Sequence, residues 1–275
     1  MKNRGSLLGQ LGLTLYAISI FLPLVWVLSS SLKSGDQIFA NPWSLPTNPQ
    51  FGNYGEAWNS AGIAKYFLNS AIATVGGLIL LIPIGAMAAY VFAKYTFRGS
   101  KAAFATFLGG MMFPNFLVVV PLFFLMGQLS MLDTLHGLII VYVAYSLSFT
   151  IFVLTGFFQA LPNELMEAAM LDGCGHSQTF WKVMMPLARP GLLVVAVFNG
   201  IGLWNEYPLA LVLMSSDSKR TLPLGLADMA MRQQYTANYG ALFAALVMVM
   251  LPVLLVYWIF RDRIHDVMLA GAVKG

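Results

Sequence analysis

The chain consists of long apolar runs separated by shorter polar segments. A helix needs about 20 predominantly apolar residues to cross the hydrocarbon core of a bilayer, so each run predicts one transmembrane helix. The pattern therefore predicts an all-α membrane protein with a single membrane domain over residues 1–275. The six predicted spans are residues 11–31, 67–93, 104–127, 137–158, 191–213 and 241–260.

Composition agrees with this pattern. Hydrophobic residues make up 59% and charged residues 9% of the 275 residues, and the mean hydropathy is +0.75. These values exclude a water-soluble globular protein, whose surface needs more polar side chains. The first run lacks a small-residue cleavage site and is longer than the apolar part of a signal peptide, so we expect it to be retained as a span.

Lys and Arg are divided unequally between the two sides that the spans define. Basic residues in short loops stay on the cytoplasmic side. With both termini on that side it carries ten basic residues and the opposite side five, so the termini and the polar segment 161–190 are predicted to be cytoplasmic. This asymmetry explains the sequence pI of about 9.2 without nucleic acid as a partner. The ten are Lys2, Arg4, Lys94, Arg98, Lys101, Lys182, Arg189, Arg261, Arg263 and Lys274.

Segment 161–190 is a polar, helix-competent segment between two apolar spans. Asn163 can cap a helix, and Glu164 and Glu167 place negative charge in its first turn, where the helix dipole favours it. These signals predict a helix over 163–172, ended by Gly173.

The surface of this predicted helix has two interpretations. Glu164, Glu167 and Leu171 share one side, whereas Ala168 and Ala169 leave a shallow surface that a partner can approach closely. Asp172 in the last turn opposes the helix dipole. The segment is either an amphipathic helix in the membrane interface or a docking helix for another protein.

Residues 204–207 form the second candidate site. Glu206 is the one formally charged residue within the predicted spans, and an ionisable group at that depth is costly unless it faces water or a partner. Trp204, Asn205 and Tyr207 beside it make an aromatic, hydrogen-bonding group of the kind that sugars bind. An interfacial aromatic belt with one outward-leaning acid explains the same residues. Pro208 is expected to kink or loosen the helix.

Several other chemistries lack support in the sequence. The three histidines do not share a helical face at metal-ligand spacing, so no metal site is expected. The phosphate-binding motif G-x-x-x-x-G-K-[ST] is absent, so we do not expect this chain to hydrolyse ATP. An intramembrane enzyme needs a nucleophile with its base, or a motif such as H-E-x-x-H, which is also absent.

Four segments together resemble one protein family. Glu167-Ala168-Ala169, followed by Gly173 and Met185-Pro186, resembles the EAA loop of binding-protein-dependent ABC importer permeases. The final residues GAVKG are similar to the tail of carbohydrate importers of the maltose-transporter type, although a frayed terminus describes small residues and a basic end equally well. Residues 23–34 and 204–207 also look like this family, so the chain is identified as a member. The tail residues are Gly271, Ala272, Val273, Lys274 and Gly275.

The resemblance implies a type I ABC importer permease with six spans in a bacterial or archaeal cytoplasmic membrane. The implied partners are a second, homologous permease, two ATPase subunits that bind ATP and Mg, an extracytoplasmic solute-binding protein and membrane lipid. It implies that residues 163–175 couple to the ATPase and that the tail extends between the two ATPase subunits. The loop 214–240 is implied to contact the binding protein through a tip formed by Leu222, Pro223, Leu224 and Gly225.

The implied function is the import of a sugar or oligosaccharide. A glycerol-phosphate-type polyol is the alternative cargo. A secondary transporter or channel is the alternative from another class, but it is expected to show ionisable relays or interrupted repeat helices within the spans. The sequence does not name the sugar.

Overall fold

The computed structural model describes residues 4–236 and 238–272, and within them every regular element is a helix. The all-α prediction is therefore confirmed. The chain forms two compact units. The first contains Met1–Lys65 and Gly225–Pro252, and the second Tyr66–Leu224 and Val253–Gly275.

Four helices are each long and apolar enough to cross a membrane without interruption. They correspond to the first, second, fourth and sixth predicted spans, and three contain a proline, at Pro23, Pro83 and Pro252. Neighbouring helices and side chains can satisfy the carbonyl groups that such a proline leaves unpaired in a membrane. The four helices are α1 (Arg4–Ser30), α4 (Ile63–Lys94), α7 (Leu135–Ala160) and α14 (Tyr239–Ala272).

The third predicted span, 104–127, is not one continuous helix. The chain forms α5 (Ser100–Met112) and α6 (Asn115–Gln128), whose axes differ by 106°. Pro114 explains the break, because it lacks an N–H and forces Phe113 out of the helical conformation. Phe113 has the extended angles φ −73° and ψ 125°.

The fifth predicted span, 191–213, is also interrupted, next to Pro208, where the sequence indicated a kink or loosening. Helix α11 (Arg189–Trp204) ends before Asn205, and the short helix α12 (Pro208–Leu213) begins at Pro208. The segment His176–Leu187 ahead of α11 is bent from it by 74°. Counting each of the two bent pairs as one span gives up to six spans in the described residues, by length and composition.

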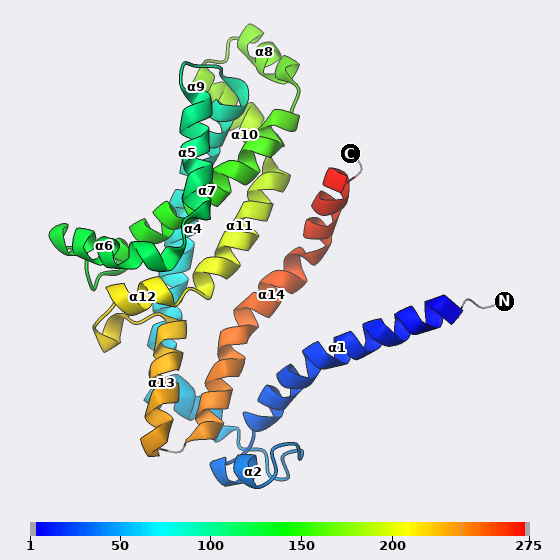
Figure 1. The fold of residues 1–275 in the computed structure, drawn as a ribbon, viewed down its shortest axis with the longest axis vertical. Coiled ribbons are helices and arrows are strands. Elements are labelled where there is room, and N and C mark those ends of the chain that lie inside the picture. Colours follow the sequence, from blue (N-terminus) through cyan, green and yellow to red (C-terminus); the bar gives the residue numbers. More distant parts are fainter. Residues whose placement is uncertain (1–3, 237, 273–275) are drawn as a thin grey trace. The chain divides into compact units, whose positions relative to one another are not determined.

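In the second unit, α5 and α11 both pack against α7 (Figure 1). Glycines allow two of the close approaches to α7. A Cβ on Gly85 of α4 would lie 2.5 Å from the Thr150 methyl carbon, and one on Gly191 of α11 would lie 2.5 Å from the Phe157 ring. Small residues let transmembrane helices approach each other in this way.

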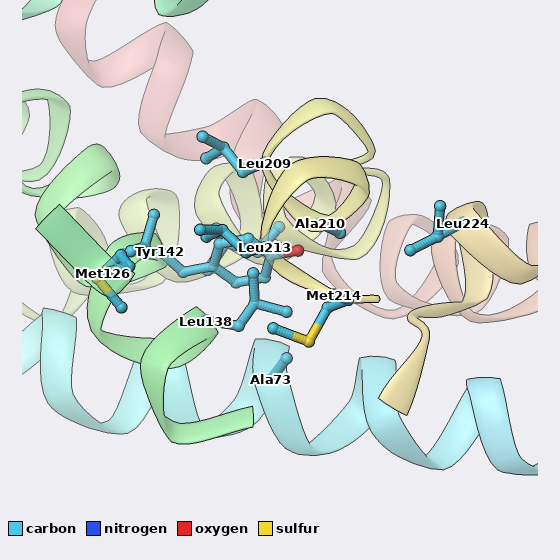
Figure 2. Packing of buried hydrophobic residues seen from close by; sticks show 11 residues of the cluster. Ala73, Met126, Leu138, Tyr142, Leu209, Ala210, Leu213, Met214 and Leu224 are labelled. Atoms are coloured by element: carbon cyan, nitrogen blue, oxygen red, sulfur yellow. The ribbon is translucent and has the colours of Figure 1, made fainter. Parts of the chain in front are cut away.

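Two clusters of buried side chains hold the second unit together. One lies around α12, where Figure 2 shows the Met214 side chain directed toward Leu138 and Ala73. The other joins α4 and α7 to the connection before α11, through rings such as those of Tyr90, Phe158 and Phe180. That connection contains α8 (Asn163–Leu171), α9 (His176–Thr179), η2 (Phe180–Met184) and α10 (Met185–Leu187).

The first unit is organised around Lys33, which is fully buried. Its ammonium donates to the carbonyl oxygens of Asn41 at 3.3 Å and Pro42 at 3.0 Å, so it fixes the segment that follows α1. Trp26 packs edge-on against Phe243 of α14, with ring centroids 5.1 Å apart. The remaining elements of the chain are α2 (Gly35–Ala40), α3 (Gly52–Gly55), η1 (Glu56–Ser60), η3 (Asp217–Lys219) and α13 (Leu222–Thr236).

Candidate functional site

Helix α8 lies outside the apolar spans and exposes most of its side chains. It packs against α9 and η2 through Met166 and Ala169. Leu171, at its last turn, is 89% exposed, an unusual position for a large apolar side chain in a polar segment. Glu164, Glu167, Ala168, Asp172 and Gly173 are also exposed.

The N-terminus of α8 differs from the prediction. Asn163 is the first helical residue and does not cap the helix, because Pro162 occupies the cap position. The Asn163 side chain instead accepts a hydrogen bond from the Lys94 ammonium at 2.8 Å, and Lys94 also donates to the Leu161 carbonyl at 2.5 Å. These bonds tie the start of α8 to the end of α4.

The C-terminus of α8 matches the predicted stop at Gly173. Gly173 has φ +87°, a left-handed conformation that glycine adopts without strain. The Gly173 N–H donates to the Met170 carbonyl and the Cys174 N–H to the Ala169 carbonyl, both at 3.0 Å. This is the Schellman arrangement. Asp172 is the C-cap residue, not a member of the last turn.

Ala169 does not contribute to the outer surface of α8. It is 7% exposed and faces its own unit, so the expectation that both alanines face a partner is wrong for this residue. Helical periodicity places Ala169 on the side of Met166, which packs into the aromatic cluster. Ala168 is exposed, as predicted.

A cavity of about 730 Å³ lies within the second unit, beside the α5–α6 break and the α11–α12 break. Its lining comes from α5, α6, α7, α11 and α12. Three polar side chains, Ser146, Asn199 and Glu206, line it among aromatic rings. The rings are those of Phe113, Phe116, Tyr145, Phe149 and Phe198.

Glu206 lies in the break between α11 and α12 and holds the start of α12. Its Oε1 accepts from the Leu209 N–H at 2.6 Å, and its Oε2 from the Ala210 N–H at 3.1 Å. The buried Tyr142 hydroxyl of α7 donates to the same Oε2 at 3.0 Å. The carboxylate therefore caps α12 and links it to α7.

The other three residues of the predicted group do not line this cavity. Trp204 is buried and packs edge-on against Phe67, with centroids 5.1 Å apart. Asn205 is exposed and donates to the Ile201 carbonyl at 2.9 Å, while Tyr207 packs against the cluster around α12. The predicted four-residue group is therefore wrong as a single site, because the helix break points its members in different directions.

The expected loop tip at 222–225 is also not observed. Leu222 is fully buried, Leu224 is 6% exposed, and both belong to α13. The Leu222 N–H donates to the Ser70 hydroxyl at 2.8 Å, which fixes the start of α13 to α4. Pro223 and Gly225 belong to the same first turn, so these residues form a helix start and not an exposed tip.

Asp133, in the α6–α7 turn, anchors the chain just before this helix. It accepts hydrogen bonds from the Ser215 N–H at 3.1 Å and the Ser216 N–H at 2.9 Å, and from the Ser216 hydroxyl. Lys219 lies 3.4 Å away. Burial alone would raise the pKa of Asp133, but these hydrogen bonds and the Lys219 charge outweigh it and lower the pKa to about 2.

The C-terminal residues can be placed only in part. Gly271 and Ala272 end α14, whereas Val273, Lys274 and Gly275 lie outside the described residues. Within the described part of the chain, no group of three or more His, Cys, Asp or Glu residues could hold a metal ion.

Sequence reasoning missed Tyr142, Asn199 and Ser146. Each is a polar side chain inside a long apolar helix, which is the available signal, because such groups need a partner or a cavity in a membrane. The sequence does not say which of the many polar residues in the spans meet, since that depends on how the helices pack.

Several known proteins are similar to this chain. The family model for the binding-protein-dependent transport system inner membrane component matches residues 81–262. The diacetylchitobiose uptake system permease protein NgcG of Streptomyces coelicolor is 47% identical over 95% of this chain and 85% of that protein. The trehalose transport system permease protein SugB of Mycobacterium tuberculosis is 32% identical over 92% of each.

A solved structure has a similar fold. A chain from a bacterial ABC transporter involved in the import of the acidic polysaccharide alginate has a TM-score of 0.82 and 25% sequence identity. The similarity covers 95% of this chain and 98% of that chain.

Proposed function

This chain belongs to the binding-protein-dependent transport system inner membrane components, and we propose a transport mechanism for it that follows from this membership. It is a multi-pass permease of an ABC importer for sugars or oligosaccharides in the cytoplasmic membrane, and it is not itself catalytic. A system of this kind works with a binding protein and an ATPase.

We propose that α8 is the element that couples this permease to the ATPase. The exposure of Leu171 carries the proposal, because an 89% exposed leucine beside exposed acids suits a small apolar anchor with a charged rim. The contact surface would consist of Glu164, Glu167, Ala168, Leu171, Asp172 and Gly173.

The attachment of α8 suits it to transmit force. Lys94 ties its start to α4, and Met166 packs into the aromatic cluster that also contains residues of α4 and α7. A displacement of α8 by the ATPase would therefore move these spans with it. We place both termini and α8 on the cytoplasmic side, in agreement with the distribution of Lys and Arg.

The complete importer would contain a second, homologous permease and two ATPase subunits that bind ATP and Mg. The tail residues 271–275 would reach those subunits, and an extracytoplasmic binding protein would deliver the cargo. The apolar surface of α1 supports a lipid or permease partner, because none of its most apolar window is buried within this chain.

We propose that the cavity at Glu206 forms part of the sugar pathway and that the cargo is an oligosaccharide of the diacetylchitobiose type. The supports are 47% identity with NgcG and a cavity that combines aromatic rings with buried polar groups. Aromatic rings can stack on the apolar faces of sugars, and the polar groups can bond to their hydroxyls.

The test of coupling uses Glu167→Arg and Leu171→Ser in the importer reconstituted with its binding protein. We expect both to lower sugar-stimulated ATP hydrolysis at least about tenfold, since anchor residues commonly contribute 2 kcal/mol or more. Glu56→Arg, an exposed acid of η1 in the other unit, is the matched control and is expected to retain activity. Unchanged hydrolysis in both α8 variants would exclude α8 as the coupling element.

A further inference from the structure

The cavity at Glu206 contains a buried asparagine whose orientation is fixed by the protein. Asn199 of α11 is 7% exposed. Its side-chain nitrogen donates to the Thr150 hydroxyl oxygen at 3.0 Å and to the Val195 carbonyl at 2.8 Å. Because a carbonyl only accepts, the nitrogen must face Val195 and the amide cannot be reversed.

This arrangement leaves one polar atom of Asn199 for the cavity. Both N–H groups of the amide are used, and Oδ1 has no hydrogen-bond partner among the described residues. Thr150 cannot serve as a donor to it, because its hydroxyl donates to the Ser146 carbonyl at 2.9 Å. An amide oxygen without a protein partner in a membrane span is costly unless a ligand or water bonds to it.

Glu206 also has a hydrogen-bond acceptor site that no protein group fills. A carboxylate has about four acceptor sites, and the N–H groups of Leu209 and Ala210 and the Tyr142 hydroxyl occupy three of them. These donors fix the carboxylate at the wall of the cavity and leave it able to accept one more hydrogen bond.

The cavity offers no positive charge. None of the described residues that line it is Lys, Arg or His, and its walls are mainly aromatic and aliphatic. A cargo carboxylate would find no counter-ion there and would be repelled by Glu206 in surroundings where charges are weakly screened. A hydroxyl or amide N–H of the cargo would instead meet Asn199 Oδ1 or Glu206.

We propose that this cavity is a saccharide subsite that selects hydrogen-bond donors. It takes a neutral sugar through its hydroxyl and acetamido N–H groups, and it excludes uronic acids. Thr150, Val195 and Tyr142 act as positioning residues, because they orient the two acceptors without reaching the cargo. The inference rests on the proposed function and adds a rule of cargo selection within the permease itself.

The proposed exclusion of carboxylates can be compared with the cargo of a relative that shares the fold. That relative belongs to a transporter of the acidic polysaccharide alginate. We therefore expect this chain not to pass such a cargo, although the two chains share a fold with a TM-score of 0.82.

The experiment measures sugar binding to the purified complex of permeases and ATPase without the binding protein, so that the binding protein's own selectivity does not contribute. The probes are diacetylchitobiose and a dimannuronate of similar size. We expect the neutral disaccharide to bind at least about tenfold more tightly, since one unpaired buried polar group is worth 1–3 kcal/mol. Equal or tighter binding of the dimannuronate would overturn the proposal.

Variants test the named acceptor. Asn199→Leu removes Oδ1 at similar volume, and Asn199→Ala is the smaller alternative. We expect either to raise the KM for diacetylchitobiose uptake about tenfold, with a smaller effect on kcat. The matched control is Asn205→Leu, an exposed asparagine six residues along the chain that does not line the cavity, and its KM is expected to stay unchanged.

The outcomes separate this inference from the proposed function. If the unaltered importer takes up diacetylchitobiose and the Asn199 variants keep its KM, the subsite is wrong and the function stands. If the importer shows no uptake and no sugar-stimulated ATP hydrolysis, the proposed cargo is wrong. The binding measurement with diacetylchitobiose and the dimannuronate tests the exclusion of uronic acids separately. It uses the unaltered complex, so it remains decisive if neither Asn199 variant folds.

Discussion

Thr150 shows how one residue connects packing to the candidate cargo site. Its methyl group lies against Gly85 of α4, and its hydroxyl oxygen accepts the Asn199 amide. The absence of a side chain at Gly85 therefore lets α4 approach α7 and leaves Thr150 where it orients Asn199. A glycine in a transmembrane helix has a packing function here, and that packing positions a polar group of the cavity.

Gly85→Ala is expected to destabilise the protein by about 1–3 kcal/mol, because a Cβ would lie 2.5 Å from the Thr150 methyl carbon and helices must separate to admit it. Thermal unfolding of the purified protein measures the effect. Gly109→Ala in α5 is the control, since a Cβ there meets no atom within 4 Å. Equal unfolding temperatures for the two variants would contradict this explanation of the packing.

The sequence predicted α1, α4, α7 and α14 because their apolar runs are long and each continues as one helix. Hydropathy did not predict the break at Pro114, because it measures burial and does not distinguish a straight helix from two bent ones. At Pro208 the sequence indicated a kink or loosening, and the chain is interrupted just before that residue. In the polar segment 161–190 the helix stop at Gly173 was predictable from local backbone chemistry, whereas the cap at Asn163 was not formed, because its side chain accepts a hydrogen bond from Lys94. The cavity was not predictable, because it exists only where α5, α7, α11 and α12 meet.

The segment between α12 and α13 depends on anchors from elsewhere in the second unit, and Asp133 of the α6–α7 turn is one of them. Its pKa is about 2 in the folded protein, below the usual value of about 3.9, so its contribution to stability is present above about pH 4 and is lost as the pH falls toward 2. We expect Asp133→Asn to lower the unfolding free energy by about 1–2 kcal/mol at pH 6.

The difference in unfolding free energy between Asp133→Asn and the unaltered protein is expected to narrow as the pH falls from 4 to 2. Protonation of Asp133 removes its negative charge in the unaltered protein, as the substitution does. Asn also tolerates the positive φ of 53° at this position, so the backbone is not the cause of the change. Unfolding temperatures of both proteins at several pH values measure the difference. A gap that stays constant with pH would show that the Asp133 charge does not anchor the segment.

At the scale of the whole molecule, the chain is one component of a larger assembly. Its α1 helix exposes an apolar surface along most of its length, and α8 presents an exposed leucine outside the spans. The cavity lies within one unit of the chain, and we propose that a second permease beside it completes the route for the cargo. We propose that α8 joins this permease to an ATPase.

The most direct test purifies the tagged chain from its native membrane in mild detergent and identifies the proteins that accompany it by mass spectrometry. We predict recovery of a second permease and an ATPase, and loss of the ATPase alone when residues 163–175 are scrambled in a variant that still inserts. Scrambling residues 42–52 of the first unit is the control and is expected to retain the ATPase. Retention of the ATPase by the 163–175 variant would contradict the coupling role of α8. Purification of the chain as a lone homo-oligomer would contradict its assembly with a second permease and an ATPase.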